Sequence, residues 1–256
     1  MTATASATGI GAPVRRKEDF RFITGQGQYT DDVVRPGETK AVFVRSPHAH
    51  AKIKSIDVSA AKTMPGVVDV LTGAQLATDK VGSLICGWMI HSKDGSPMKM
   101  APHPALASDK VNCVGDAVAV VIAETTAQGR DAAEKVKVDY EVLAAVVDPA
   151  KAQAKGAPQI HPDIADNTIY QWSLGEQSAV DAAFAAAKHV TKLDIINNRL
   201  VPNAMEPRAA LAEYDAGTDN LTLWNTSQNP HVARLVISAF VGITPEHKLR
   251  VIAPDV

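Results

Sequence analysis

Residues 197–256 read NNRLVPNAMEPRAALAEYDAGTDNLTLWNTSQNPHVARLVISAFVGITPEHKLRVIAPDV, and the interpretation of the whole chain depends on this stretch. Apolar or small residues alternate with polar ones over 208–214, and the extended pattern resumes over 221–224 after a segment of turn residues. This alternation predicts two half-buried strands. Pro230 suits the first turn of a helix, where its missing N–H would have no partner anyway. Apolar residues then follow at helical spacing until Gly242, which predicts a helix that ends there.

The loop between the second strand and the helix contains Gln228. A polar loop that leads into a helix N-terminus is a common place for a binding group, and a glutamine amide both donates and accepts hydrogen bonds. The alternative is that Gln228 only caps the helix that Pro230 opens. Considered without any other context, the capping role is the favoured interpretation.

Strands and helices alternate through the first part of the chain, which predicts an α/β domain over residues 20–150 that follows a mobile tail at 1–19. Within this domain, the apolar run at 116–124 indicates a strand that is buried on both faces. Residues 151–166 carry glycine and proline without a hydrophobic period, and we interpret them as a linker. A second domain is predicted over 167–256.

Three further segments complete this organisation. Residues 82–105 have no hydrophobic period and predict a long irregular excursion. An alanine-rich pattern over 178–187 predicts an amphipathic helix. Residues 190–196 alternate and predict a strand that delivers the chain to the stretch quoted above.

Composition indicates a globular protein and excludes several classes of function. Of the 256 residues, 46% are hydrophobic and 21% are charged, and the net charge of −2 argues against a nucleic-acid partner. The N-terminus lacks the apolar core of a signal peptide, and no apolar run is long enough to span a bilayer. Two cysteines in a chain of this size, Cys86 and Cys113, indicate reduced and buried thiols. We therefore expect a soluble, cytoplasmic protein.

Other patterns give weaker indications. His48 and His50 lie two residues apart beside a strand, but no third ligand completes a set, so we predict no metal site. Glu206 and Arg208 are interpreted as an ion pair that braces a strand, in preference to groups that contact a substrate. The GxG within residues 24–32 lacks a preceding strand and a following helix, which excludes a Rossmann-type dehydrogenase.

A series of longer segments is more specific than any of these motifs. The chain contains, in order, RFITGQGQYTDDV, AVFVRSPHAHAKIKSIDVSAA, MPGVVDVLTG, LASDKVNCVGDAVAVVIAET, AAEKVKVDYEVLAAVVD, NRLVPNAMEPRAALAEYD, TLWNTSQNPH and HKLRVIAPDV. Together they resemble the N-terminal portion of the large, molybdopterin-binding subunit of the molybdenum hydroxylases, the family of xanthine dehydrogenase, aldehyde oxidase and aerobic carbon monoxide dehydrogenase. The resemblance implies an α/β hammerhead domain at 20–150 and the first part of a molybdopterin-binding domain at 167–256.

The resemblance also implies a chemistry. It implies an oxidoreductase that oxidises carbon monoxide, an aldehyde or an N-heterocycle with oxygen derived from water. The implied cofactor is molybdenum–molybdopterin in its cytosine dinucleotide form, and electrons pass to Fe–S and FAD groups on small and medium partner subunits. Gln228, in TSQNPH, matches the family's glutamine whose amide hydrogen-bonds an oxo ligand of the molybdenum. In this context we favour the ligand contact over the capping role.

The family's glycine-rich segment and its general-base glutamate are expected beyond Val256, so the resemblance implies no catalytic residue in this chain. We therefore expect a fragment that is inactive by itself, or one half of a split subunit that a second chain completes. The alternative is a non-catalytic docking or assembly module that retains the hammerhead domain. The intact TSQNPH loop favours the enzyme, and the missing segments favour the module.

Overall fold

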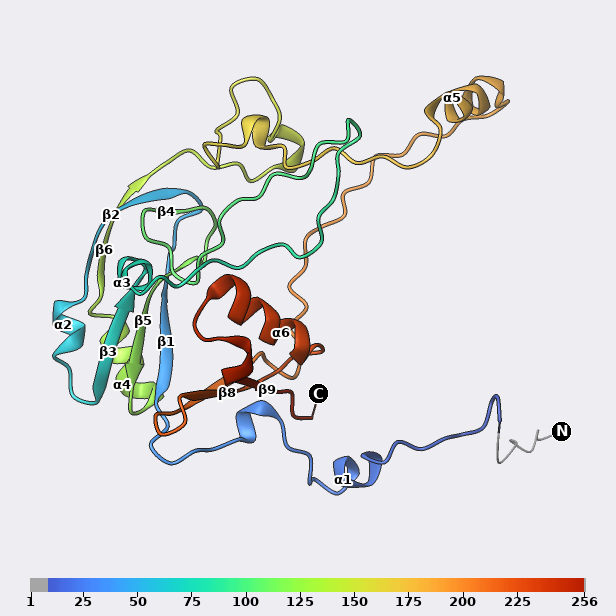
Figure 1. Ribbon diagram of the computed structural model, residues 1–256. Coiled ribbons are helices and arrows are strands. Elements are labelled where there is room, and N and C mark those ends of the chain that lie inside the picture. Colours follow the sequence, from blue (N-terminus) through green and yellow to red (C-terminus); the bar gives the residue numbers. More distant parts are fainter. Residues whose placement is uncertain (1–8, 256) are drawn as a thin grey trace. The chain divides into compact units, whose positions relative to one another are not determined.

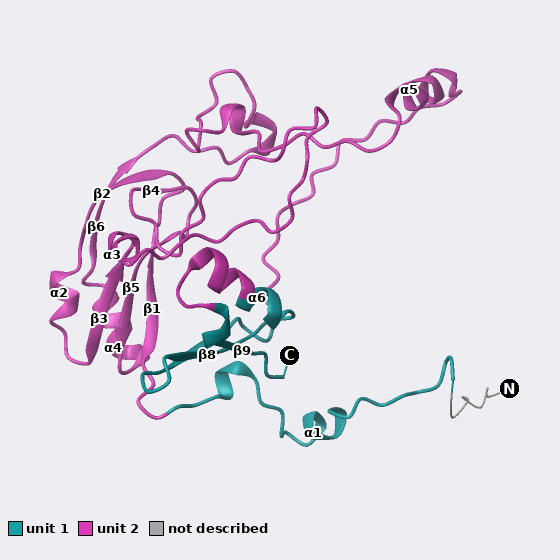
Figure 2. Cartoon of the chain, in the orientation of Figure 1, with its two compact units in different colours: residues 1–35, 204–234, 246–256 teal, residues 36–203, 235–245 magenta. Residues whose placement is uncertain are grey.

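The computed structural model describes residues 9–255, so residues 1–8 of the predicted mobile tail lie outside the described part of the chain. The chain divides into two compact units that interleave in sequence (Figure 2). Unit 1 comprises the chain up to Arg35, Ala204–Arg234 and the chain from Glu246, whereas unit 2 comprises Pro36–Asn203 and Leu235–Pro245. The predicted linker at 151–166 lies inside unit 2. The described chain combines short helices with small sheets, which confirms the mixed α/β class (Figure 1).

The first sheet of unit 2 is antiparallel and has the strand order β1-β5-β3. Its strands are β1 (Lys40–Arg45), β5 (Ala117–Ala123) and β3 (Val67–Thr72). Five of the seven residues of β5 are buried, as the apolar run at 116–124 predicts for a strand covered on both faces. The alternation of strand side chains explains this burial, because Val118 packs into one hydrophobic cluster and Val121 into another.

The second sheet of unit 2 is also antiparallel, with the order β4-β2-β6. Its strands are β4 (Lys110–Val111), β2 (Ala51–Asp57) and β6 (Lys137–Val142). The cluster that contains Val118 of β5 also contains Ala51 and Val111, so the core of unit 2 includes side chains from both sheets. Both sheets meet the requirement that each apolar face packs against another layer.

Short helices cover the other cluster of the first sheet. Unit 2 contains α2 (Ser59–Lys62), α3 (Gly73–Thr78) and α4 (Thr126–Ala133), and residues of α2 and α4 pack with β3 and β5. Thr125 caps α4, because its Oγ1 accepts a hydrogen bond from the backbone N–H of Gln128 at 3.3 Å. The cap satisfies an N–H group that has no partner within the helix.

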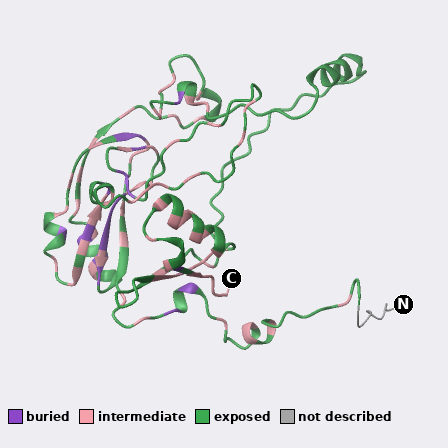
Figure 3. Ribbon diagram, in the orientation of Figure 1, coloured by how far each residue is buried: buried purple, intermediate pink, exposed green. Residues whose placement is uncertain are grey.

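The remainder of unit 2 contains little regular structure. Residues 82–105 form the predicted irregular excursion, and 3₁₀ turns occur at Pro149–Lys151 and Ala165–Asn167. The helix α5 (Gln177–Ala186) confirms the helix predicted at 178–187, but it is exposed along its whole length (Figure 3). The strand predicted at 190–196 is wrong, because residues 188–204 form neither helix nor strand. A strand needs a neighbour for its backbone hydrogen bonds, and no described strand pairs with this segment.

Unit 1 contains the third sheet, β7-β8-β9, formed by β7 (Ala210–Asp215), β8 (Asn220–Asn225) and β9 (Leu249–Ile252). The predicted hairpin is confirmed, because β7 and β8 pair antiparallel, and β9 adds to β8 in parallel. Trp224 is buried under the guanidinium of Arg35, 4.4 Å from the ring centroid. Such a contact attracts the cation electrostatically to the ring face. Two short helical elements, α1 (Asp19–Ile23) and a 3₁₀ turn at Thr30–Asp32, precede this sheet in the sequence.

The helix α6 (Pro230–Val236) begins at Pro230 as predicted and continues as a π-helical segment, Ile237–Val241. Gly242 ends it with a φ of 76°, a left-handed conformation that glycine adopts without steric cost. A 3₁₀ turn at Glu246–Lys248 then leads into β9. Within residues 9–255, no helix has the length and apolar character needed to cross a bilayer.

Candidate functional site

The loop that carries Gln228 joins the end of β8 to the start of α6 and is held by its own side chains. Ser227 Oγ accepts a hydrogen bond from the backbone N–H of Asn229 at 3.1 Å. Asn229 Oδ1 in turn accepts from the backbone N–H of Val232 at 3.1 Å. Because Val232 is the third residue of α6, Asn229 is the N-cap of this helix. The structure therefore assigns the cap to Asn229, and the capping role considered for Gln228 is wrong.

Gln228 itself is exposed, and its side-chain amide has no hydrogen-bond partner among residues 9–255. The residues on either side fix the backbone while the amide stays available. A glutamine amide in this position can donate to an anionic oxygen without titrating. The position at the carboxyl end of a strand, before a helix, is one where ligands commonly bind in α/β proteins. The loop therefore presents a neutral hydrogen-bond donor and acceptor to solvent.

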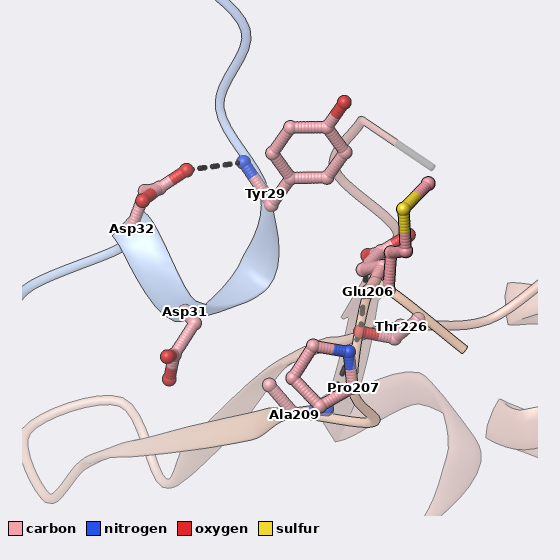
Figure 4. A pocket seen from close by; sticks show the side chains of 8 residues that line it. Tyr29, Asp31, Asp32, Glu206, Pro207, Ala209 and Thr226 are labelled. Atoms are coloured by element: carbon pink, nitrogen blue, oxygen red, sulfur yellow. Dashed lines mark hydrogen bonds between the residues drawn. The ribbon is translucent and has the colours of Figure 1, made fainter. Parts of the chain in front are cut away.

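A pocket of about 440 Å³ lies in unit 1, close in sequence to the same loop (Figure 4). It is lined by Tyr29, Asp31, Asp32, Met205, Glu206, Pro207, Ala209 and Thr226. The hydroxyl of Thr226 donates to Glu206 Oε1 at 3.5 Å, and the backbone N–H of Tyr29 donates to Asp32 Oδ2 at 2.9 Å. Three carboxyl groups without a lysine or arginine in the lining repel anions. The pocket is therefore unsuited to a cofactor that carries phosphate.

The structure corrects the prediction that Glu206 and Arg208 form an ion pair. No ion pair joins these two side chains in the described part of the chain, so they do not brace the strand as predicted. Sequence reasoning did not identify Asp31 and Asp32 as neighbours of Glu206. Their segment contained only a turn signal, and the separation along the chain is too long for any local pattern to reveal that these residues line one pocket.

The two cysteines are both free and exposed, so the prediction of buried thiols is wrong. Cys113 Sγ donates a hydrogen bond to Asp116 Oδ1 at 2.9 Å. The hydrogen bond to the Asp116 carboxylate disfavours the thiolate, and together with partial desolvation of the sulfur atom in this otherwise exposed residue it raises the pKa of Cys113 from 9.0 to about 11. The local structure thus suppresses the reactivity of this thiol. The same carboxylate also accepts from the backbone N–H groups of Asn112 and Cys113, which closes the turn before β5.

The histidines that were considered for a metal site serve other contacts. His48 packs edge-on against Tyr140, with ring centroids 5.0 Å apart. His50 is buried, and its Nδ1 lies 2.7 Å from the carbonyl oxygen of Ala144. Residues 9–255 contain no group of three or more histidine, cysteine, aspartate and glutamate side chains arranged to hold a metal ion.

Comparison with known protein families assigns both parts of the chain. Residues 24–144 match the family described as "Aldehyde oxidase and xanthine dehydrogenase, a/b hammerhead domain". Residues 160–256 match the family described as "Molybdopterin cofactor-binding domain". The chain belongs to the molybdenum hydroxylase large-subunit family. The hammerhead match includes both sheets of unit 2, and the molybdopterin match includes α5, the β7-β8-β9 sheet and Gln228.

Relatives within the molybdenum hydroxylases agree with this assignment. The chain is 40% identical to the carbon monoxide dehydrogenase large chain of Afipia carboxidovorans, over 97% of this chain and 31% of that protein. It is 37% identical to the nicotine 6-hydroxylase large subunit of Paenarthrobacter nicotinovorans, over 96% of this chain and 29% of the relative. The chain therefore spans about 30% of the length of these relatives.

A solved structure shows the same fold. The quinoline 2-oxidoreductase of Pseudomonas putida 86 matches 95% of this chain and 30% of its own chain, with a TM-score of 0.85 and 34% identity. This similarity supports the hammerhead and molybdopterin-binding assignments for the two matched regions.

Proposed function

We propose that this chain forms the N-terminal part of the large subunit of a molybdenum hydroxylase. The complete enzyme would oxidise carbon monoxide, an aldehyde or an N-heterocycle with oxygen derived from water. The succession of a hammerhead match and a molybdopterin-binding match supports this function. The names of the relatives include a carbon monoxide dehydrogenase and a nicotine hydroxylase, so they support the reaction class but do not select a substrate.

The observation that carries the proposal is the state of Gln228. Its amide is exposed and without a partner in the described chain, while Ser227 and Asn229 hold the backbone on both sides. A preorganised neutral donor of this kind stabilises negative charge that develops on an oxygen without adding a charge of its own. We assign Gln228 the role of donating a hydrogen bond to an oxo ligand of the molybdenum. No residue of the described chain is assigned a catalytic role.

When bound, molybdenum–molybdopterin, in the cytosine dinucleotide form that we propose, supplies the redox centre. Electrons would leave through Fe–S and FAD groups on a small and a medium partner subunit, and relatives that are named as a large chain and a large subunit support the presence of partner subunits. The two free and exposed cysteines, Cys86 and Cys113, support a reducing compartment, and we place the enzyme in the cytoplasm.

The test compares two variants that add the same charge to neighbouring residues. Gln228→Glu removes the amide donor, whereas Asn229→Asp retains the N-cap because aspartate and asparagine cap helices equally well. Both are made in the assembled enzyme, together with the remaining large-subunit sequence and the partner subunits. Molybdenum content is measured by elemental analysis, and kcat with the substrate that the wild-type enzyme oxidises. We expect Gln228→Glu to lower kcat by about 10²-fold or more, as loss of one such donor does. Asn229→Asp should lower it by less than about tenfold.

Equal kcat values for the two variants would show that the Gln228 amide does not act on the reacting group. Molybdenum content distinguishes the enzyme from the non-catalytic docking module. An assembly that binds its partner subunits but contains no molybdenum would support the module, whereas near-stoichiometric molybdenum supports the proposed function. Analysis of this chain alone, alongside the assembly, shows whether residues up to 256 hold the metal without the remaining sequence.

A further inference from the structure

Residues 172–203 of unit 2 form a segment, termed the arm, that is not buried against the rest of the described chain. Every residue of the arm is exposed, including all of α5 (Figure 3). Its hydrogen bonds are local, such as the one that the backbone N–H of Val180 donates to the carbonyl of Glu176 at 3.1 Å. Within residues 9–255, no hydrogen bond or ion pair joins the arm to another segment.

The arm is rich in apolar side chains that the described chain leaves uncovered. Ten of its 32 residues are large, apolar and exposed, and the exposed fraction is 60% for Phe184, 77% for Leu193 and 76% for Ile195. Single exposed apolar residues are normal on a protein surface, whereas a concentration of them marks an interaction site. The composition of the arm therefore indicates a surface that another polypeptide covers.

The helix of the arm has one apolar face. In α5, Val180 and Phe184 are four residues apart, so their side chains share a face of the helix. Asp181 lies on another face and accepts a hydrogen bond from the side chain of Gln177 at 2.8 Å. The helix can therefore pack Val180 and Phe184 against a second layer while its polar groups stay in water.

The segment 190–196, with the sequence VTKLDII, has the period of a strand. Because successive side chains of a strand point to opposite faces, Leu193 and Ile195 would share one face. Lys192 and Asp194 would share the opposite, polar face. The run contains no glycine or proline, and its valine, threonine and isoleucine residues favour strands. Within the described chain it lacks a neighbouring strand for its backbone N–H and carbonyl groups.

The remaining large-subunit sequence is the polypeptide that fits this surface. The chain spans about 30% of the length of its relatives, so about 70% of such a subunit lies outside it. The solved quinoline 2-oxidoreductase matches 95% of this chain but only 30% of its own, with a TM-score of 0.85. The unmatched 5% is about 13 residues, fewer than the 32 of the arm. Most of the arm therefore follows the same path in a chain about three times as long.

The charge and the position of the arm favour the same occupant. The arm carries three acidic and three basic side chains, so it has no excess charge that would attract a membrane surface or a nucleic acid. It lies within the match to the molybdopterin-binding domain at 160–256 and outside the hammerhead match. A segment of the same polypeptide also has a high effective concentration at the arm, which a second copy lacks.

We propose that residues 190–196 pair as a strand with a strand of the remaining large-subunit sequence, and that Val180 and Phe184 of α5 pack against the resulting sheet. The segment is not a strand in this chain because the remaining sequence supplies its neighbour. Such strand addition takes its affinity from main-chain hydrogen bonds and its specificity from alternate side chains. The inference rests on the proposed function in one respect, that this chain is part of a longer subunit. It depends neither on the role of Gln228 nor on a particular substrate.

The experiment is amide hydrogen exchange of peptides from 190–196, measured in this chain alone and in the assembled enzyme, with molybdenum determined in the same samples. Peptides from β5 are the reference, because this strand is buried within unit 2. We expect 190–196 to exchange at nearly the intrinsic rate in the chain alone and at least about 100-fold more slowly in the assembled enzyme. The β5 peptides should be protected in both samples.

Two variants test the orientation of the strand. Leu193→Gln places an amide on the face predicted to be buried, whereas Lys192→Gln places the same residue on the opposite face. Both side chains are exposed in this chain, so neither substitution should change the protection of β5. In the assembled enzyme, Leu193→Gln should speed the exchange of 190–196 by about tenfold or more, because the burial of one leucine side chain is lost. Lys192→Gln should change it by less than about threefold.

Exchange of 190–196 that is as fast in the assembled enzyme as in the chain alone would overturn the proposal, and so would equal effects of the two variants. Protection in the chain alone that increases with its concentration would show that a second copy covers the arm, which also overturns it. Molybdenum content separates this inference from the proposed function. Protection of 190–196 in an assembly without molybdenum supports the inference while the proposed function fails, and near-stoichiometric molybdenum with unprotected 190–196 has the opposite meaning.

Discussion

Asp116 controls the reactivity of Cys113, and the substitution Asp116→Asn tests this control. In the wild type, the Sγ of Cys113 donates to Asp116 Oδ1 at 2.9 Å, and this bond is the main cause that raises the pKa of the thiol from 9.0 to about 11, with desolvation of the thiol as a second cause. An asparagine retains an oxygen acceptor for the turn but carries no charge. The substitution therefore removes the main cause that disfavours the thiolate and should return the pKa of Cys113 towards 9.0.

The magnitude combines two opposing effects. At pH 8, a thiol with a pKa of about 11 is about 0.1% ionised, whereas one with a pKa of 9.0 is about 10% ionised. The thiolate fraction thus increases by about 100-fold. The less basic thiolate is also a weaker nucleophile, and a Brønsted coefficient of about 0.4–0.5 reduces its intrinsic rate by about six- to tenfold over two units of pKa. Because desolvation of the thiol also raises this pKa and remains in Asp116→Asn, about 10- to 15-fold is the upper limit of the expected increase in the alkylation rate of Cys113.

The assay is alkylation with iodoacetamide at pH 8, followed residue by residue by mass spectrometry. Cys86 provides an internal control, since it is also exposed and donates to the carbonyl of Trp88 rather than to a carboxylate. Its rate should be the same in both proteins. If Cys113 is alkylated at the same rate in the wild type and in Asp116→Asn, the carboxylate does not set the pKa of the thiol and the reasoning fails.

Two further predictions concern the packing and capping of α4. An alanine Cβ at position 129 would lie 2.7 Å from the Cγ2 of Val42. The resulting overpacking costs about 1–3 kcal/mol, whereas the helix propensity of alanine contributes about 1 kcal/mol of stability. Gly129→Ala should therefore destabilise unit 2 by roughly 1 kcal/mol. This destabilisation is measured as a decrease in the urea concentration at which α4 and β5 lose half of their hydrogen-exchange protection. An increase in that midpoint would contradict the predicted overpacking against Val42. Thr125→Ala should lower the same midpoint by an amount equivalent to about 1 kcal/mol, because the N-cap hydrogen bond from the Gln128 N–H is lost. The control Thr126→Ala should change the midpoint little. Equal effects of the two substitutions would refute the capping role of Thr125.

Local patterns in the sequence predicted most of the regular elements. Alternation predicted β7 and β8, the apolar run predicted the buried β5, and Pro230 and Gly242 marked the ends of the helix and its π-helical extension. These predictions are confirmed because turn residues and side-chain periodicity determine secondary structure locally, within the segment that contains them. The strand predicted at 190–196 is wrong because an alternating pattern shows only which side chains of a strand could be buried. Whether a strand forms depends on a partner, which the local sequence does not specify.

The candidate site shows the same limit. The sequence predicted Gln228 as a candidate binding residue, but no local pattern distinguished it from Asn229 as the helix cap, because the two residues are adjacent and both carry amides. The pocket lined by Asp31, Asp32 and Glu206 depends on residues far apart in the chain, so no motif indicated it. Likewise, the exposure of Cys113 and its bond to Asp116 follow from the turn that precedes β5 rather than from composition.

The interleaving of the two units has a consequence for how the chain folds during synthesis. Unit 1 combines the chain up to Arg35 with Ala204–Arg234, so the ribosome must first complete Pro36–Asn203. At a synthesis rate of about 5–20 residues per second, the early segment waits roughly 10–30 s for its partners. The sheets of unit 2, whose β1–β6 strands all lie within Pro36–Asn203, have their complete sequence available during that interval. Unit 1 should therefore be the last part of the chain to fold, and during synthesis its first segment remains exposed to chaperones and proteases.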